Sequence, residues 1–488
     1  MKRMVRFLKI IFCLLSSFLF LKNSFSQSIT FEKNYSSDGA TSGNCVQQTF
    51  DRGYIITGMA YSIVTAQDVV LMKTDSLGNL TWTKIYGGIN TDAGFYVEQT
   101  PDSGYIVVAE KDLISTTNST IWLLKTDANG DTLWTKTISA GAGANVPSCI
   151  RQTYDGGFVI TGYTSARGAG SYDVLLVKTN SVGDTLWTRT FGGADADVGY
   201  CVQQTSDSGF VIAGSYQPNF YSDVYLIKTD KSGDSLWTRT YDKGQSDLAY
   251  TVQETNTGDY VLAGYTWNVS MSNYDMYLIK TNHSGDTLWT KIIGDSTENG
   301  AYCLEITSDG GIIIAGTTHV SGSGNVYDVF LVRTDSLGDT LWTKKYGGEK
   351  PDQGYFVRQT SDGGYIIVGS TACFDTIPGY NIYLVKTDSV GGVVIGINDP
   401  ENIKVGGILL YPNPFSFTAT VEFPMQNKGS NNLFYEIDDV LGRLLVMKRI
   451  DQNQNTFTIE KNNLISGIYL LKIIADKKII YNIKFIIQ

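Results

Sequence analysis

The sequence of 488 residues predicts an all-β protein in which a repeated unit is followed by a smaller domain. Three observations lead to this prediction. A unit recurs at a nearly constant period, each copy contains four short strand-like segments, and one copy is divided between the two ends of the repeat region. Together they favour a closed seven-bladed β-propeller followed by a small Ig-like β-sandwich.

Two short phrases mark the repeated unit. A Lys-Thr-Asp-like core recurs every 50 to 53 residues and begins at Lys73, Lys125, Lys178, Lys228, Lys280, Arg333 and Lys386. A Thr-x-Asp-Gly-Gly-Tyr-like run begins at Thr49, Thr100, Thr153, Thr205, Thr255, Thr307 and Thr360. This period is typical of arrays of supersecondary units, so the fold has to be derived from one unit.

One unit is interpreted as four short strands joined by tight turns. In the fourth copy the predicted strands cover residues 200–205, 210–214, 223–228 and 235–241. Because the connections are short, we expect neighbouring strands to pair antiparallel in chain order. Apolar residues at both parities of the second and third strands indicate sheets that are covered on both faces, as in adjacent propeller blades.

The two ends of the repeat region complement each other. The seventh copy ends at residues 386–391 without the tryptophan strand that follows in the other copies. A matching segment, residues 30–35, lies at the start, where Phe31 precedes Trp82 by one repeat. Pairing the two ends would satisfy both sheet edges, whereas an open solenoid would leave them exposed. We therefore predict a closed propeller over residues 27–388.

The first 26 residues differ from the rest of the chain. A basic start with Lys2 and Arg3 is followed by an apolar run over residues 10–20, and small residues precede Gln27. This pattern predicts a cleaved signal peptide over residues 1–26, with a membrane anchor as the alternative. No later stretch is long and apolar enough for a spanning helix, so we expect no transmembrane segment in the mature chain.

Charge and histidine content narrow the possible functions. The chain has 38 basic and 48 acidic residues, a net charge of −10, which argues against nucleic-acid binding. Its two histidines, His283 and His319, are too few for a histidine-rich metal site and argue against a Ser-His-Asp triad. The turn at residues 127–131 has oxygens at calcium-loop spacing, but the copy at residues 335–339 lacks the middle oxygen, so a capped turn explains both. We predict no cofactor and no metal.

The cysteines are interpreted as packing residues. Cys45, Cys149, Cys201 and Cys303 each lie four residues before the repeat threonine, where other copies carry Tyr, Thr or Phe. Of the six cysteines, Cys13 falls in the predicted signal peptide, and the odd number that remains cannot all pair. Because packed sheets lie about 10 Å apart, we predict no disulfide between Cys149 and Cys201.

The last part of the chain, residues 406–488, lacks the repeat phrases and consists of short apolar strand-like segments. It carries three ordered motifs, which contain Tyr411, Pro412, Asn413 and Pro414, then Gly442 and Arg443, then Gly467 and Tyr469. These motifs closely resemble the C-terminal (type A) sorting domain of type IX secretion cargo proteins from Bacteroidota. The resemblance implies export by the type IX secretion machinery to the medium or the outer cell surface. The alternative is an unrelated Ig-like adhesive module, and residues 389–405 are predicted to be a linker.

The loops between the second and third strands give the candidate ligand site. They vary in length and chemistry, whereas the turns on the opposite rim are nearly uniform. The candidate ligand-binding aromatics in these loops are Tyr216, Phe220, Trp267 and Tyr274. Such rings suit stacking on sugars, while the alternative is that they only cover the ends of the blades.

We expect a binding module for a glycan, a peptide or another surface partner, not an enzyme, and no catalytic residue is assigned. Carboxylates do recur where one copy passes to the next, at Asp92, Asp197, Asp247, Glu298 and Asp352. Their recurrence indicates that they fasten loops. Two alternatives remain: a glycan hydrolase that uses paired carboxylates, or a purely structural surface protein.

Overall fold

The structure is a computed structural model of the chain. It describes residues 29–36, 41–61, 67–111, 119–218, 220–294, 297–320, 326–372, 379–393, 409–411, 415, 417–423, 433–439, 443–451, 454–461, 464–475 and 478–487. Every regular element in these residues is a β-strand, so the predicted all-β class is confirmed. Within the same residues there is no helix that could cross a membrane. The predicted signal peptide lies outside the described residues.

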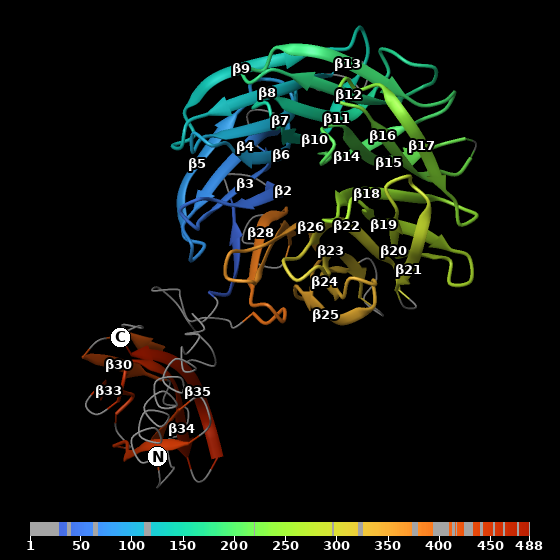
Figure 1. Cartoon of the computed structure of the whole chain (residues 1–488). Coiled ribbons are helices and arrows are strands. Elements are labelled where there is room, and N and C mark those ends of the chain that lie inside the picture. The colour runs from blue at the N-terminus through green and yellow to red at the C-terminus, as the bar shows by residue number, and fades with distance from the viewer. Residues whose placement is uncertain are drawn as a thin grey trace, which may run out of the picture. The chain divides into compact units, whose positions relative to one another are not determined.

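The chain divides into two compact units, Met1–Val394 and Ile395–Gln488. In the first unit, four-stranded antiparallel sheets follow one another around a common centre, as Figure 1 shows from blue β2 to orange β28. The sheets have the orders β2-β3-β4-β5, β6-β7-β8-β9, β10-β11-β12-β13, β14-β15-β16-β17, β18-β19-β20-β21, β22-β23-β24-β25 and β26-β27-β28-β1. The predicted antiparallel order within each unit is therefore confirmed.

Strands in equivalent positions have similar bounds. The first strands, which lie nearest the centre, are β2 (Thr41–Gln48), β6 (Ala93–Gln99), β10 (Asn145–Gln152), β14 (Val198–Gln204), β18 (Asp247–Glu254), β22 (Asn299–Ile306) and β26 (Asp352–Gln359). The second strands are β3 (Tyr54–Tyr61), β7 (Tyr105–Lys111), β11 (Phe158–Thr164), β15 (Phe210–Tyr216), β19 (Tyr260–Asn268), β23 (Ile312–His319) and β27 (Tyr365–Thr371).

The remaining two positions lie farther from the centre. The third strands are β4 (Gln67–Thr74), β8 (Thr120–Thr126), β12 (Asp173–Thr179), β16 (Asp223–Thr229), β20 (Asn273–Thr281), β24 (Tyr327–Thr334) and β28 (Asn381–Thr387). The fourth strands are β5 (Leu80–Tyr86), β9 (Thr132–Ile138), β13 (Thr185–Phe191), β17 (Ser235–Tyr241), β21 (Thr287–Ile293), β25 (Thr340–Tyr346) and β1 (Phe31–Tyr35). Second and third strands are buried on both faces, whereas the fourth strands are largely exposed, because only the middle strands are covered by the neighbouring sheets.

The two recurring phrases meet at the end of each sheet. In the fourth sheet, Lys228 Nζ lies 2.8 Å from Asp207 Oδ2 and donates to the Thr229 carbonyl at 2.9 Å. Thr205 Oγ1 donates to the same carboxylate at 2.5 Å. A buried ammonium needs such partners to offset the loss of hydration. The phrases that define the repeat are therefore structural.

Aromatic side chains connect successive sheets. The Trp82 ring of β5 lies 6.0 Å from the Tyr105 ring of β7 in the next sheet. Phe31 of β1 makes the same contact with Tyr54 of β3, also at 6.0 Å. Tyr35 Oη donates to the Gly78 carbonyl at 2.5 Å. Strand β1 thus lies in the sheet with β26, β27 and β28 and contacts the sheet of β2 to β5 as other fourth strands contact their neighbours.

The second unit contains two antiparallel sheets that share one core. The first consists of β29 (Leu409–Tyr411), β30 (Thr418–Glu422) and β33 (Thr456–Glu460). The second consists of β31 (Leu433–Asp439), β32 (Leu444–Arg449), β34 (Gly467–Ala475) and β35 (Lys478–Ile487). Buried residues of both sheets, such as Val421 and Leu471, belong to the same hydrophobic cluster. Most of the predicted linker at residues 389–405 lies outside the described residues.

Candidate functional site: a cavity among the first strands

A cavity of about 460 Å³ lies among the first strands of the first unit. Each first strand contributes to its lining, and so do the ends of β3, β7 and β11. The lining includes Asn44, Phe95, Ser148, Tyr200, Tyr250, Tyr302 and Tyr355, which are equivalent residues of successive copies. Each first strand begins at the rim that carries the variable loops between second and third strands. The equivalent lining residues lie near the starts of these strands, so the cavity lies toward that rim.

A β-bulge sets the orientation of these equivalent residues. The pairing between first and second strands shifts register around each of them, as between Gly199 and Cys201 in the fourth sheet and between Ala249 and Thr251 in the fifth. A bulge leaves the extra residue unpaired and redirects its side chain. In these sheets the extra residues are Tyr200 and Tyr250, and both side chains line the cavity.

A small residue precedes most of these bulges because the preceding sheet approaches closely. At Gly94, an added Cβ would lie 2.6 Å from Thr57 Oγ1 and 2.9 Å from the Gly58 carbonyl oxygen of the neighbouring sheet. These distances are shorter than a van der Waals contact. The glycine therefore allows the sheets to converge on the centre and brings Phe95 to the cavity.

Four of the tyrosines form a continuous row. The ring centroids of Tyr200 and Tyr250 are 4.7 Å apart, those of Tyr250 and Tyr302 are 5.2 Å apart, and those of Tyr302 and Tyr355 are 5.8 Å apart. Burial raises the pKa of each of these four phenols. They remain protonated at neutral pH, so the row offers both aromatic faces and hydroxyl groups to a bound molecule.

The inner end of the cavity is closed by aromatic and cationic groups. The Tyr96 and Phe356 rings pack edge to face with centroids 5.3 Å apart. Arg358 Nη2 donates to Tyr96 Oη at 2.6 Å, and the Arg151 guanidinium lies 4.6 Å from the Tyr96 ring centroid. Arg151 Nη1 also lies 2.8 Å from Glu98 Oε1. Both arginines also line a second cavity, which is otherwise lined mostly by glutamines.

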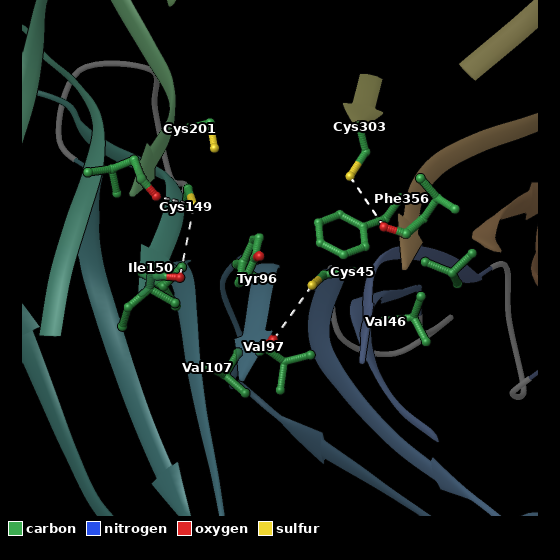
Figure 2. Close-up of a cluster of buried hydrophobic side chains, with 14 of the residues drawn as sticks. Cys45, Val46, Tyr96, Val97, Val107, Cys149, Ile150, Cys201, Cys303 and Phe356 are labelled. Carbon is green, nitrogen blue, oxygen red and sulfur yellow. Dashed lines mark hydrogen bonds between the residues drawn. The ribbon is translucent and has the colours of Figure 1, made fainter. Parts of the chain in front are cut away.

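The cysteines lie beside this inner end. Figure 2 shows Cys45, Cys149, Cys201 and Cys303, each on a first strand, around Tyr96 and Phe356. All four are buried and free, which confirms the predicted absence of a Cys149–Cys201 disulfide. The 10 Å spacing on which that prediction rested does not hold here, because the first strands converge: Cys149 Sγ donates to the Val202 carbonyl of the next first strand at 3.9 Å. The neighbouring Cys149 thiol lowers the pKa of Cys201, whereas burial raises the pKa of Cys149.

Two of the predicted ligand-binding aromatics connect to the tyrosine row. Trp267, in β19, and Tyr274, in β20, are cross-strand partners with ring centroids 4.8 Å apart. The ring centroids of Tyr274 and Tyr265 are 4.6 Å apart, and those of Tyr265 and Tyr250 are 5.9 Å apart. The structure places Trp267 and Tyr274 in strands, not in the loop predicted for them, because the second and third strands of this sheet are longer than in other copies.

The other two predicted aromatics lie apart from this row. Tyr216, at the end of β15, packs against Tyr225 with ring centroids 5.2 Å apart. Phe220 is 95% exposed, and no ring contact joins it to another aromatic side chain in the described part of the chain. That Tyr216 and Phe220 contact a ligand stays a prediction.

The recurring carboxylates fasten loops, as predicted. Asp197 Oδ1 and Oδ2 accept hydrogen bonds from the backbone N–H groups of Gln217 at 2.9 Å and Gly193 at 2.5 Å. Asp352 Oδ2 accepts the corresponding bond from Gly348 N–H at 2.8 Å. Burial raises the pKa of Asp197, but these backbone donors oppose the rise.

The predicted sorting residues are partly described. Tyr411 ends β29 and is exposed, Arg443 Nε lies 2.6 Å from Asp439 Oδ2, and Gly467 begins β34. Tyr469 is buried, and its hydroxyl donates to the Ile465 carbonyl at 2.6 Å. Pro412, Asn413, Pro414 and Gly442 lie outside the described residues.

Sequence reasoning missed the residues that line the cavity. The available signal was the position five residues before the repeat threonine, where five copies carry an aromatic residue: Phe95, Tyr200, Tyr250, Tyr302 and Tyr355. This pattern does not by itself indicate a site, because an aromatic residue in a strand is as readily a core residue. Only the bulge shows that the ring leaves the regular alternation of the strand.

Comparison with curated proteins and solved structures gives limited matches. Over 130 residues the chain is 28% identical to the regulatory protein FlaEY of Caulobacter vibrioides, a match covering 24% of this chain and 13% of that protein. Puromycin hydrolase is 13% identical with a TM-score of 0.49, covering 79% of this chain and 59% of that chain. The β-propeller domain of the Trilobed protease from Pyrococcus furiosus is 11% identical with a TM-score of 0.39, covering 77% of this chain and 99% of that chain. The chain thus spans less than two thirds of FlaEY and of puromycin hydrolase.

The C-terminal match is of a different kind. Residues 409–488 match the family described as secretion system C-terminal sorting domain, which agrees with the resemblance seen in the motifs. Such a domain implies export by a type IX secretion system and hence a secreted or cell-surface protein. The chain therefore carries a secretion system C-terminal sorting domain behind a repeated β-propeller-like region.

Proposed function

We propose that this protein is a secreted or surface-attached binding module of a bacterium of the Bacteroidota. A closed seven-bladed propeller over residues 27–388 binds a glycan in the cavity among its first strands. Residues 406–488 direct export by the type IX machinery after the signal peptide, residues 1–26, has been removed. The linker covers residues 389–405.

Recurring contacts between sheets support the closed ring. Phe50 N–H donates to Gln99 Oε1 of the next sheet at 2.8 Å, and Ser308 N–H donates to Gln359 Oε1 at 2.8 Å. Ser361 N–H, in the sheet of β26 to β28 and β1, donates to Gln48 Oε1 of β2 at the same distance. An interaction that joins successive sheets thus also joins the last sheet to the first.

The tyrosine row is the observation that carries the binding proposal. Flat aromatic faces stack on the apolar faces of sugar rings, and the neighbouring phenol groups exchange hydrogen bonds with sugar hydroxyls. The cavity volume lies within the range of small-molecule sites. Trp267 and Tyr274 extend the aromatic surface from Tyr250 along the fifth sheet, so they are proposed to contact the next sugar outside the cavity.

The lining favours binding over glycan hydrolysis. Glycosidases place two carboxyl groups on either side of the scissile bond. Among the described lining residues Glu110 is the single carboxylate. Burial raises its pKa. One carboxylate does not supply both the acid and the base, so we propose that the protein is not an enzyme.

A glycan array probed with the purified propeller region and full-length protein tests the function. We expect bound glycans that are not shortened, with binding weakened by about 1–3 kcal/mol in Tyr250→Ala and in Trp267→Ala, the range for loss of an aromatic anchor. Phe220→Ala is the matched control, because it removes an exposed ring outside the row. Loss of binding in Phe220→Ala but not in Tyr250→Ala would instead assign the site to the exposed loop, and release of shorter products would indicate a hydrolase.

A further inference from the structure

Two arginines interrupt an otherwise uniform position of the repeat. The position two residues before the repeat threonine is occupied by Gln47, Glu98, Arg151, Gln203, Gln253, Glu305 and Arg358. Five copies therefore carry an amide or a carboxylate there, and the third and seventh copies carry a guanidinium. Because the same unit folds with an amide or a carboxylate at this position, the two arginines need an explanation other than the fold of the unit.

The five amides and carboxylates have a structural role. Gln47 Oε1 accepts a hydrogen bond from Gln99 N–H of the next sheet at 2.6 Å. Gln203 Oε1 accepts the equivalent bond from Glu254 N–H at 2.8 Å. An arginine has no acceptor atom, so Arg358 cannot make this link. Its presence removes an interaction that the other sheets use, and its Nη2 donates instead to Tyr96 Oη of the second sheet.

The two arginines differ in how their charge is balanced. Arg151 forms an ion pair with Glu98 at 2.8 Å. Within the described residues, Arg358 forms no ion pair; its Nη2 donates to Tyr96 Oη, and its guanidinium lies 4.6 Å from the Phe356 ring centroid. The charge of Glu305 acts on Arg358, but Glu305 Oε2 accepts the backbone hydrogen bond from Gln359 N–H. Most of the five Arg358 donors are therefore available to a ligand.

Arg358 lies at the inner end of the same cavity that the tyrosine row lines. A guanidinium with free donors binds a carboxylate in a planar, two-bond geometry. The protein's net charge of −10 disfavours a polyanionic ligand, but it does not disfavour a ligand with a single terminal carboxylate. Stacking on Tyr250 favours a sugar ring as the group that carries this carboxylate.

On the basis of the proposed glycan-binding function, we propose that the cavity binds a terminal sugar acid, with its carboxylate on Arg358 and its ring on the tyrosine row. The non-acidic remainder of the glycan then extends past Tyr265 and Trp267 toward the rim. Arg151, which is neutralised by Glu98, holds Tyr96 in place and does not contact the ligand.

Calorimetric titration of the full-length protein tests this proposal with three probes: a disaccharide ending in glucuronate, its counterpart ending in glucose, and a dipeptide with a free terminal carboxylate. We expect the glucuronate probe to bind at least ~10-fold more tightly than the glucose probe, the scale of a hydrogen bond to a charged group. Arg358→Gln, which restores the residue found in three other copies, should remove this preference. Arg239→Gln, which removes a charge on the outer strand β17, is the control and should retain it.

The outcomes separate the two levels of the proposal. Equal binding of both sugars, with dependence on Tyr250, would overturn the sugar-acid assignment and leave the proposed glycan function standing. Preference for the dipeptide would overturn the assignment in favour of a peptide terminus. Absence of binding by both sugars would overturn it as well, and the proposed function would fail separately if no neutral glycan on the array bound either.

Discussion

Strand β1 is predicted to stabilise the first unit by joining its last sheet to its first. Phe31 is 6% exposed and packs against Tyr54 of the neighbouring sheet, so Phe31→Ala removes a buried aromatic ring from the junction. Truncation of a buried phenylalanine costs about 3–5 kcal/mol. Deletion of residues 28–37 should cost more, because the edge of β28 then also loses its hydrogen bonds to β1.

Urea denaturation of the purified protein measures this effect. We expect Phe31→Ala to lower the transition midpoint clearly, since one or two kcal/mol is already a large part of the stability of a domain. Phe220→Ala is the matched control, because the same truncation at a 95% exposed ring should change the midpoint little. Equal midpoints for wild type, Phe31→Ala and the deletion would show that the ends do not support each other, as in an open array.

Three further predictions concern export, acid stability and thiols. Deletion of residues 406–488 should leave a folded propeller in the periplasm, as fractionation of expressing cells would show; appearance of the truncated protein in the medium would contradict the sorting role. Although burial acts in the opposite direction, hydrogen bonds from Thr153, Gly157 and Lys178 lower the pKa of Asp155 to about 2. The stabilising effect of the Asp155 carboxylate is therefore complete above its unfolded pKa near ~4 and is lost as the pH falls toward ~2. Asp155→Asn should make the urea midpoint less dependent on pH between these two values. Cys149 and Cys201 should both be alkylated after denaturation without reduction; a linked pair in mass mapping would contradict their assignment as free thiols.

The sequence was sufficient for the strand order because the turns repeat. Residues 235–241 of the fourth copy form the fourth strand β17, and residues 223–228 fall within β16. The first strand was harder to delimit, because the bulge at Tyr200 interrupts its alternation. Trp267 was assigned to a loop because a longer hairpin in the fifth sheet could not be told from a loop by periodicity.

The candidate site was only partly predictable, for a physical reason. A ring of equivalent residues is formed by long-range convergence of first strands, and no single copy reveals it. The departure of Arg151 and Arg358 from the glutamine and glutamate of other copies was visible in the sequence. The sequence does not show that the glutamine side chains accept backbone hydrogen bonds from the next sheet, which an arginine cannot do.

A crystal structure of the protein with its best-binding array glycan tests the central claim most directly. We expect density for a sugar ring between Tyr200, Tyr250 and Tyr302, with its next sugar near Trp267. Density over the exposed Phe220 loop, with the cavity among the first strands empty, would contradict it.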